Sequence, residues 1–92
     1  MVEQAMVITN RLGLHARAAA QLVSAANRFK SQMRIERLDG SATADAKSIL
    51  SVLMLAASHG TELKLSADGV DESQAVEALA KLFANGFGEL AT

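Results

Sequence analysis

The chain contains no cysteine and only three aromatic side chains, all of them phenylalanine. The absence of cysteine excludes disulfides, thiol catalysis and cysteine-ligated zinc sites. Only two histidines are present, so we expect no metal site. We also expect no cofactor. Because aromatic residues are scarce, the core has to consist of leucine, isoleucine, valine, methionine and many alanines, which favours close packing of helices on a sheet.

Charges nearly balance, with a net charge of −1, and no lysine and arginine cluster combines with aromatic stacking residues. This composition argues against a nucleic-acid-binding protein. No stretch approaches the ~18 apolar residues that cross a bilayer, and residues 1–4 lack the basic start of a secretion signal. We therefore expect no membrane insertion and a cytoplasmic protein. Half of the 92 residues are hydrophobic, which predicts one globular domain over residues 1–92.

The spacing of apolar residues predicts the order β-α-β-β-α-β-α. Strands are expected at residues 6–9, 33–36, 41–44 and 62–66, and helices at residues 16–28, at 48–57 and after residue 71. Alternation ends at Arg37-Leu38, which indicates a bulge or the end of a strand. The strands alternate between apolar and polar residues, as is typical of antiparallel sheets with one solvated face. The sequence thus predicts an α+β fold, an open-faced β-sandwich in which three helices cover one face of a four-stranded, mainly antiparallel sheet.

Turn and capping signals mark several of these boundaries. Asp39-Gly40 predicts a hairpin turn, because glycine accepts a positive φ at no steric cost. Ser48 is a suitable N-cap, and it favours a helix over a buried strand for the apolar run that follows. Asp71 and Gln74 resemble a capping box, and Gly86 suits the position just after a helix.

His15 lies where a glycine-containing loop gives way to an alanine-rich helical segment. The first backbone N–H groups of a helix have no partner within it and attract anions. Arg17 adds a guanidinium suited to phosphate oxygens. A phosphoryl group carried on the His15 imidazole would be held by Arg17 and by the backbone N–H groups of Ala16, Arg17 and Ala18. The alternative is a surface histidine beside a solvated arginine.

The second helix carries more apolar surface than one core contact can cover. One stripe consists of Ile49, Val52, Leu53 and Ala56, and a second consists of Leu50, Met54 and Ala57. Packing one stripe on the sheet would leave the other partly exposed, which usually indicates a partner. The alternative is that Leu50 and Met54 belong to the core.

Two segments resemble the HPr family, the histidine-containing phosphocarrier proteins of the bacterial phosphotransferase system. They are Gly13-Leu14-His15-Ala16-Arg17 and Ala46-Lys47-Ser48-Ile49-Leu50, and the similarity extends over nearly the whole chain. Residues 8–13 and 82–87 look more like the nitrogen-branch form of the family, whereas Lys47-Ser48-Ile49 looks more like the sugar-branch form. The branch therefore stays open.

The resemblance implies a stoichiometric phosphoryl carrier that is not itself an enzyme. His15 would accept a phosphoryl group from the phosphorylated histidine of enzyme I, charged by phosphoenolpyruvate, and pass it to an A-type domain of enzyme II. Arg17 would assist at the phosphate. The family usually has proline directly after this arginine, whereas this chain has Ala18, which is less rigid but leaves one more N–H free near the phosphate.

The resemblance also gives Ser48 and the second helix possible roles. Ser48 matches a serine that an HPr serine kinase/phosphorylase modifies in some bacteria, although a plain N-cap explains it locally. Docking residues would be Leu14, Ile49, Leu50, Leu53 and Met54, and brief docking favours a monomer. Two further hypotheses stay open: a regulatory interaction protein whose output is set by phosphorylation of Ser48 or His15, and a small α+β binding domain with an incidental histidine. His59 is expected to be exposed and inert.

Overall fold

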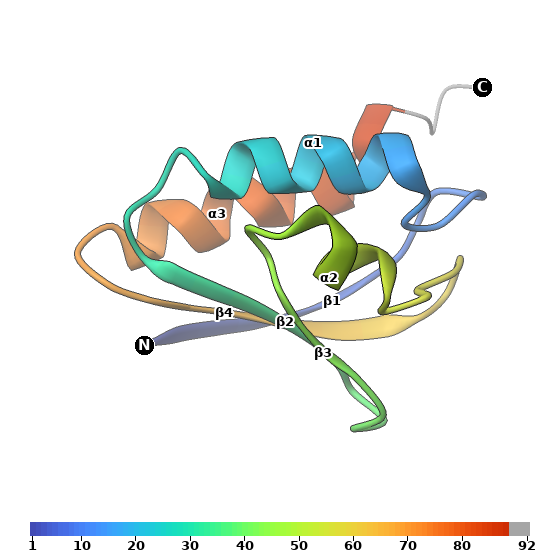
Figure 1. Ribbon diagram of the computed structural model, residues 1–92, viewed down its shortest axis with the longest axis horizontal. Coiled ribbons are helices and arrows are strands. Elements are labelled where there is room, and N and C mark those ends of the chain that lie inside the picture. Colours follow the sequence, from blue (N-terminus) through green and yellow to red (C-terminus); the bar gives the residue numbers. More distant parts are fainter. Residues whose placement is uncertain (89–92) are drawn as a thin grey trace.

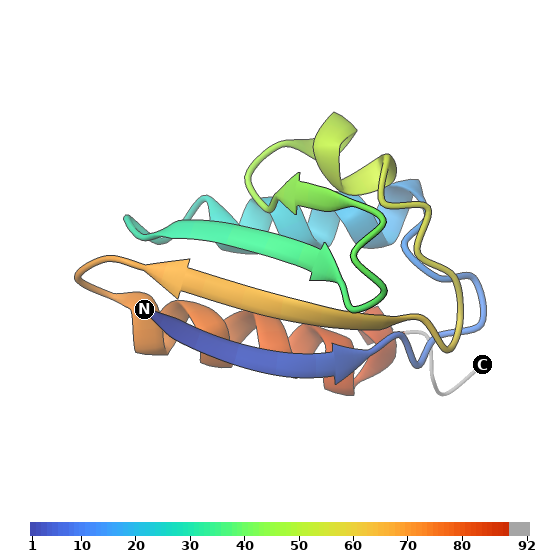
Figure 2. The same cartoon turned by 90° about the horizontal axis from the view of Figure 1, so that it is seen from below.

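The computed structural model describes residues 1–88, which form an open sheet with helices on one face (Figure 1). The elements are β1 (Val2–Val7), α1 (Ala16–Ala26), β2 (Gln32–Arg37), β3 (Thr43–Asp45), α2 (Ile49–Leu53), β4 (Glu62–Asp68), α3 (Glu72–Ala84) and the short 3-10 turn η1 (Gly86–Gly88). The strand order is β1-β4-β2-β3, and each neighbouring pair is antiparallel. Figure 2 shows the other face of the sheet without a helical cover. The predicted open-faced α+β fold is confirmed.

The core lies between the sheet and the helices. Apolar residues on the inner face of β2 and β4 alternate with polar ones, and the buried residues of α1 and α3 pack against them. The residues of this layer are Met33, Ile35, Leu63, Leu65 and Ala67 from the strands, Ala18, Ala19, Leu22 and Ala26 from α1, and Ala75, Val76, Leu79 and Phe83 from α3. Because so many are alanines, the helix backbones can lie close to the sheet.

Strand β1 begins and ends earlier than residues 6–9, the predicted range. Its extent is set by pairing with β4, from Val2 opposite Ala67 to Val7 opposite Glu62. Polar residues in its first half are tolerated because β1 is an edge strand with one solvated face. Tertiary pairing therefore outweighed the local apolar signal.

Two helices are shorter than predicted. α1 ends at Ala26 rather than near residue 28, and α2 ends at Leu53 rather than at residue 57. Met54 is the C-cap of α2, and Ala56 then adopts a left-handed φ of +50°. This conformation turns the chain out of the helix before β4.

The β2–β3 hairpin is present with a longer turn than predicted. Gly40 has a φ of +77°, as the sequence led us to expect. The Ser41 N–H donates to Asp39 Oδ1 at 2.9 Å, so Ser41 is part of the turn and not of the strand. Strand β3 consequently spans Thr43–Asp45 rather than residues 41–44.

The capping box predicted at the start of α3 is wrong, although Asp71 is the N-cap residue. The Asp71 side chain makes no hydrogen bond to its own helix. It accepts hydrogen bonds from Lys30 and Ser31 instead, because the fold brings the start of β2 beside it. Glu72 takes over the local role by accepting the Gly69 N–H at 3.0 Å.

Candidate functional site

Backbone hydrogen bonds hold the loop before His15 against the turn that precedes β4. The Leu14 N–H donates to Ala57 O at 2.9 Å, and the Gly60 N–H donates to Ile8 O at 2.9 Å. The loop is thus fixed at both its ends to a segment more than forty residues away in the chain.

Gly13 allows this close approach. Its φ is +68°, and a Cβ built on it would lie 2.5 Å from Ala57 O and 2.8 Å from the Ser58 Cα. The buried Asn10 supports the same turn, since its Nδ2 donates to Gly13 O at 2.8 Å. Glycine at this position is required by both conformation and space.

His15 is the N-cap residue of α1, as its sequence position predicted. Its backbone is extended (φ −77°, ψ 179°), and its Nδ1 accepts a hydrogen bond from the Arg17 N–H at 3.2 Å. Nδ1 therefore carries a lone pair directed at the first turn of the helix. The Arg17 N–H, expected to face an anion, is bonded to the imidazole in this state.

The residues after His15 divide between surface and core. Ala16 and Arg17 are exposed, and no ion pair of Arg17 is found within residues 1–88. The Ala18 side chain is fully buried. The first turn thus presents a guanidinium to solvent and anchors itself through an alanine methyl group.

Ser48 is the N-cap of α2, as predicted. Its Oγ accepts the Ser51 N–H at 3.3 Å, and the Ser51 Oγ in turn accepts the Asp45 N–H at 2.9 Å. The Ser48 side chain is half-buried. The residue therefore performs a local capping task whatever else it does.

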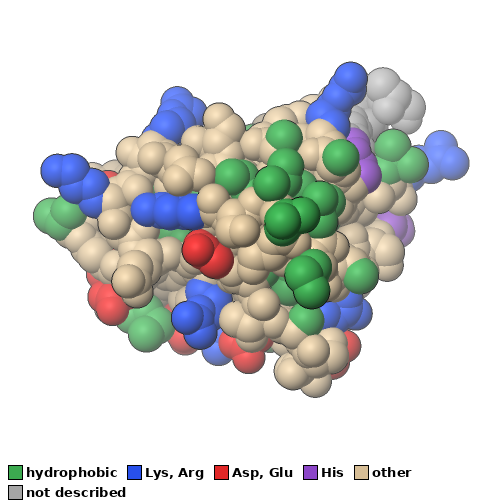
Figure 3. Space-filling model, viewed as in Figure 1, with side chains coloured by type: hydrophobic (Ala, Val, Ile, Leu, Met, Phe, Trp, Pro, Cys, Tyr) green, Lys and Arg blue, Asp and Glu red, His purple; other side chains and the backbone are tan. Residues whose placement is uncertain are grey.

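An apolar surface lies on α2, and we name Ile49, Leu50 and Met54 the α2 patch. These side chains are 41%, 72% and 79% exposed, respectively. Figure 3 shows hydrophobic side chains gathered on this face, with a histidine at one edge. Leu53 is half-buried. Leu50 and Met54 of the second predicted stripe are therefore exposed and do not belong to the core. The first stripe is divided, because Val52 is buried whereas Ile49 is exposed. Ala56 and Ala57 lie beyond the end of α2.

Leu14 is not part of this surface. It is only 6% exposed and belongs to the core. A side chain so little exposed offers almost no surface to a partner, and so the expectation that Leu14 offers a docking contact is corrected.

Sequence reasoning missed the side chains that anchor α2. Lys47 Nζ donates to Phe29 O at 2.7 Å, and Asn27 Nδ2 donates to Lys47 O at 3.3 Å. At the other end, Arg37 donates to the carbonyl of Leu55. The break in alternation at Arg37 was the only available signal, and it does not identify a partner.

Within residues 1–88, no group of three or more histidine, aspartate or glutamate side chains lies close enough to hold a metal ion. No helix in this part of the chain has the length and apolar character needed to span a bilayer. His59 is exposed in the turn before β4, as expected.

Comparisons with known proteins show the family of the chain. The family model of the PTS HPr component phosphorylation site matches residues 2–85. The phosphocarrier protein HPr of Cupriavidus necator is 47% identical over 97% of this chain and 98% of its own length. A crystal structure of HPr-C-His from Thermoanaerobacter tengcongensis has a TM-score of 0.90 at 43% identity, covering 97% of this chain and 98% of that one. An HPr dimer from the same organism has a TM-score of 0.75, also at 43% identity, covering 97% and 100%. The chain therefore belongs to the HPr family and is a phosphocarrier protein of the phosphotransferase system.

Proposed function

We propose that His15 accepts a phosphoryl group from a phosphohistidine of enzyme I, which phosphoenolpyruvate has charged, and passes it to an A-type domain of enzyme II. The hydrogen bond between His15 Nδ1 and the Arg17 N–H carries this proposal. In this bond Nδ1 is the acceptor, and it lies at the N-terminus of α1, where backbone N–H groups favour an anion. The family membership supports the same role.

The transfer step follows from the same geometry. The lone pair of Nδ1 attacks phosphorus while the phosphorus–nitrogen bond of the donor phosphohistidine breaks, and its electron pair returns to the donor imidazole. The Arg17 N–H, released from Nδ1, can then donate to a phosphate oxygen, together with the Arg17 guanidinium and the N–H groups of Ala16 and Ala18. These few contacts stabilise the phosphoryl group without preventing its departure.

The experiment is phosphorylation by enzyme I and phosphoenolpyruvate. We expect one acid-labile phosphate in the wild type and none in His15→Ala. His59→Ala is the matched control, because His59 is also a histidine with exposed surface, and it should be phosphorylated normally. Long-range proton–nitrogen NMR should assign the phosphate to Nδ1. An unphosphorylated wild type, or a phosphorylated His15→Ala, would reject the proposal.

Both partners are proposed to dock on the α2 patch together with Leu53. The exposed apolar area beside the phosphorylatable loop supports this assignment. The carrier would be a monomer, because the same surface has to face enzyme I and enzyme II in turn. Light scattering of the phosphorylated and unphosphorylated chain would test the oligomeric state.

A second function is favoured by the position of Ser48. Phosphate on the Ser48 Oγ, added by an HPr serine kinase/phosphorylase, would place negative charge beside Ile49 and Leu50 and would repel an acidic partner. Ser48→Asp mimics this charge, and Ser48→Asn is the matched control, since both residues can act as N-caps. We expect weaker binding of enzyme I by Ser48→Asp alone. Equal affinities of the two variants would argue against regulation by charge at this serine.

A further inference from the structure

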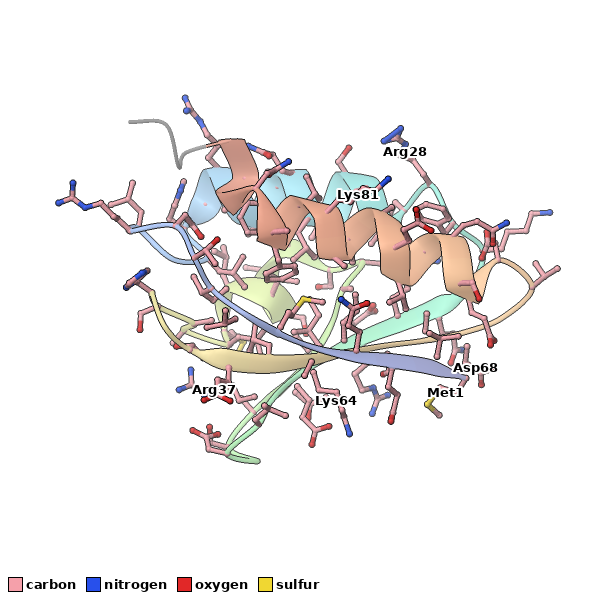
Figure 4. The ribbon with its side chains drawn as sticks, turned by 180° about the vertical axis from the view of Figure 1, so that it is seen from behind. Met1, Arg28, Arg37, Lys64, Asp68 and Lys81 are labelled. Carbon is pink, nitrogen blue, oxygen red and sulfur yellow. The ribbon has the colours of Figure 1, made fainter. Side chains whose placement is uncertain are left out.

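Arg37 ends strand β2 on the face that packs toward the helices. The residues two and four positions earlier, Ile35 and Met33, are buried apolar core residues. Arg37 continues their row opposite Leu63 of β4, and its side chain is only 23% exposed. Figure 4 shows Arg37 beside the start of β4. An arginine that is largely removed from water is stabilised by acceptors within the protein.

The donors of Arg37 reach the segment that follows α2. Nη1 lies 2.9 Å from Leu55 O and 3.4 Å from Ala56 O, both within hydrogen-bond distance. The buried Nε lies 3.5 Å from Asp39 Oδ2, an ion-pair contact rather than a hydrogen bond. Nη1 carries two hydrogens, so this single nitrogen can donate to both carbonyls at once.

The segment that Arg37 holds has a backbone conformation that its sequence disfavours. Ala56 has a φ of +50°, in the left-handed region that costs energy for any residue with a Cβ. Hydrogen bonds to the carbonyls of Leu55 and Ala56 oppose the relaxation of this turn.

The next residue connects this segment to the phosphorylation loop. Ala57 is buried, and its carbonyl accepts the Leu14 N–H at 2.9 Å. The same carbonyl limits the space at Gly13. A shift of the turn at Ala56 would therefore move the acceptor that holds the residue directly before His15.

We propose that Arg37 is a positioning residue for the His15 loop. By holding the carbonyls of Leu55 and Ala56, Arg37 keeps Ala57 O where it binds Leu14. The effect on phosphoryl transfer rests on the proposed function of His15, whereas the effect on the loop does not.

The test compares Arg37→Met with Arg34→Met. Arg34 lies on the same strand, is exposed and has no side-chain hydrogen bond or ion pair within residues 1–88. Its replacement therefore removes one positive charge, as Arg37→Met does, but leaves the contacts of Arg37 in place. Amide hydrogen exchange of Leu14 is the readout, with Leu65 in β4 reporting on global opening. We expect Arg37→Met to exchange the Leu14 amide at least about tenfold faster, with Leu65 unchanged, and Arg34→Met to behave as the wild type.

Two further variants complete the test. Arg37→Lys keeps the charge but carries it on a nitrogen one bond closer to the backbone than Nη1, so it should accelerate Leu14 exchange several-fold even if Arg37→Met fails to fold. Adding Ala56→Gly to Arg37→Lys should reverse at least half of the increase in the logarithm of the Leu14 exchange rate. The reason is that glycine adopts a left-handed φ without steric cost. Unchanged Leu14 exchange in Arg37→Lys, or equal acceleration of Leu14 and Leu65, would overturn the proposal. Among these variants, the rate of phosphorylation by enzyme I should be lower where the Leu14 amide exchanges faster. If the wild type itself accepts no phosphate, the proposed function of His15 is refuted, but the exchange result stays valid.

Discussion

The Asp71 carboxylate binds Ser31, although 40 positions separate the two residues in the chain. Asp71 Oδ1 accepts the Ser31 hydroxyl at 2.5 Å and the Ser31 N–H at 3.0 Å, and Oδ2 accepts the Lys30 N–H at 2.9 Å. These bonds join the start of α3 to the segment that leads into β2. The Ser31 hydroxyl is the main cause that lowers the pKa of Asp71 from 3.8 to about 2, with the Lys30 N–H next.

This pKa predicts how stability depends on pH. A carboxylate whose pKa is lowered by folding stabilises the native state above its unfolded pKa, and this contribution is lost as pH falls through the folded value. For Asp71 the loss should occur between about pH 4 and pH 2. Urea unfolding at several pH values should show the wild type more stable than Asp71→Asn at pH 7, with the difference shrinking across that window. Asp68→Asn is the control, since Asp68 is exposed and makes no side-chain hydrogen bond or ion pair within residues 1–88. If the difference in unfolding free energy between the wild type and Asp71→Asn did not change with pH, this account would be contradicted.

Gly13→Ala should destabilise the protein and impair phosphorylation. The new Cβ would lie 2.5 Å from Ala57 O, in addition to the strain of a positive φ. Gly40→Ala is the matched control, because Gly40 also has a positive φ, +77°, but no atom within 4 Å of the added Cβ. We expect Gly13→Ala to lose ~1–3 kcal/mol more unfolding free energy than Gly40→Ala, as judged from urea titrations. Similar losses of unfolding free energy in the two variants would show that the loop can move to accommodate the added Cβ.

Truncating the α2 patch should affect docking but not folding. Leu50 and Met54 are 72% and 79% exposed, so Leu50→Ala combined with Met54→Ala should change the unfolding free energy by no more than ~1 kcal/mol. If these residues bind enzyme I, the KM of enzyme I for the carrier should rise about tenfold. Val70→Ala removes a side chain that is 87% exposed, in the turn between β4 and α3, and should leave the KM unchanged. An unaltered KM in the double variant would place the docking surface elsewhere.

Ala18→Pro tests the contribution of one backbone N–H to the phosphate site. Proline is compatible with the first turn of α1 and should raise the unfolding free energy by ~0.4–1 kcal/mol through the unfolded state. It also removes the Ala18 N–H that is proposed to hold the phosphoryl group. We expect the equilibrium with phosphorylated enzyme I to shift about fivefold toward the unphosphorylated carrier, the effect of one hydrogen bond of ~1 kcal/mol. An unchanged equilibrium would remove the Ala18 N–H from the site.

Several features could be predicted from residues that are neighbours in the chain. The helix starts at His15 and Ser48 follow from a change of residue pattern within one turn, and both residues are N-caps in the structure. The strand alternation around Met33 and Leu63 likewise needs only a period of two residues. Family motifs lie in the same local segments, so the phosphocarrier family could also be inferred from them.

Other features depend on contacts that no local pattern encodes. The bounds of β1 are those of its pairing with β4. Leu14 is an apolar residue beside His15, and only the tertiary structure shows that its side chain is buried in the core. Asp71 has the residue type and position of a helix cap, but its carboxylate accepts a hydrogen bond from the Ser31 hydroxyl instead of capping α3.

The sequence by itself determined the order of elements, the two-layer fold and the place of His15 at a helix start, because periodicity and capping act over a few residues. Tertiary structure decided what surrounds that histidine. Gly13 meets Ala57, and Arg37 holds the turn that carries Ala57, across separations of 44 and 18 to 19 residues, respectively. Such contacts depend on how the sheet brings distant segments together, since packing and hydrogen bonding are satisfied in space rather than along the chain.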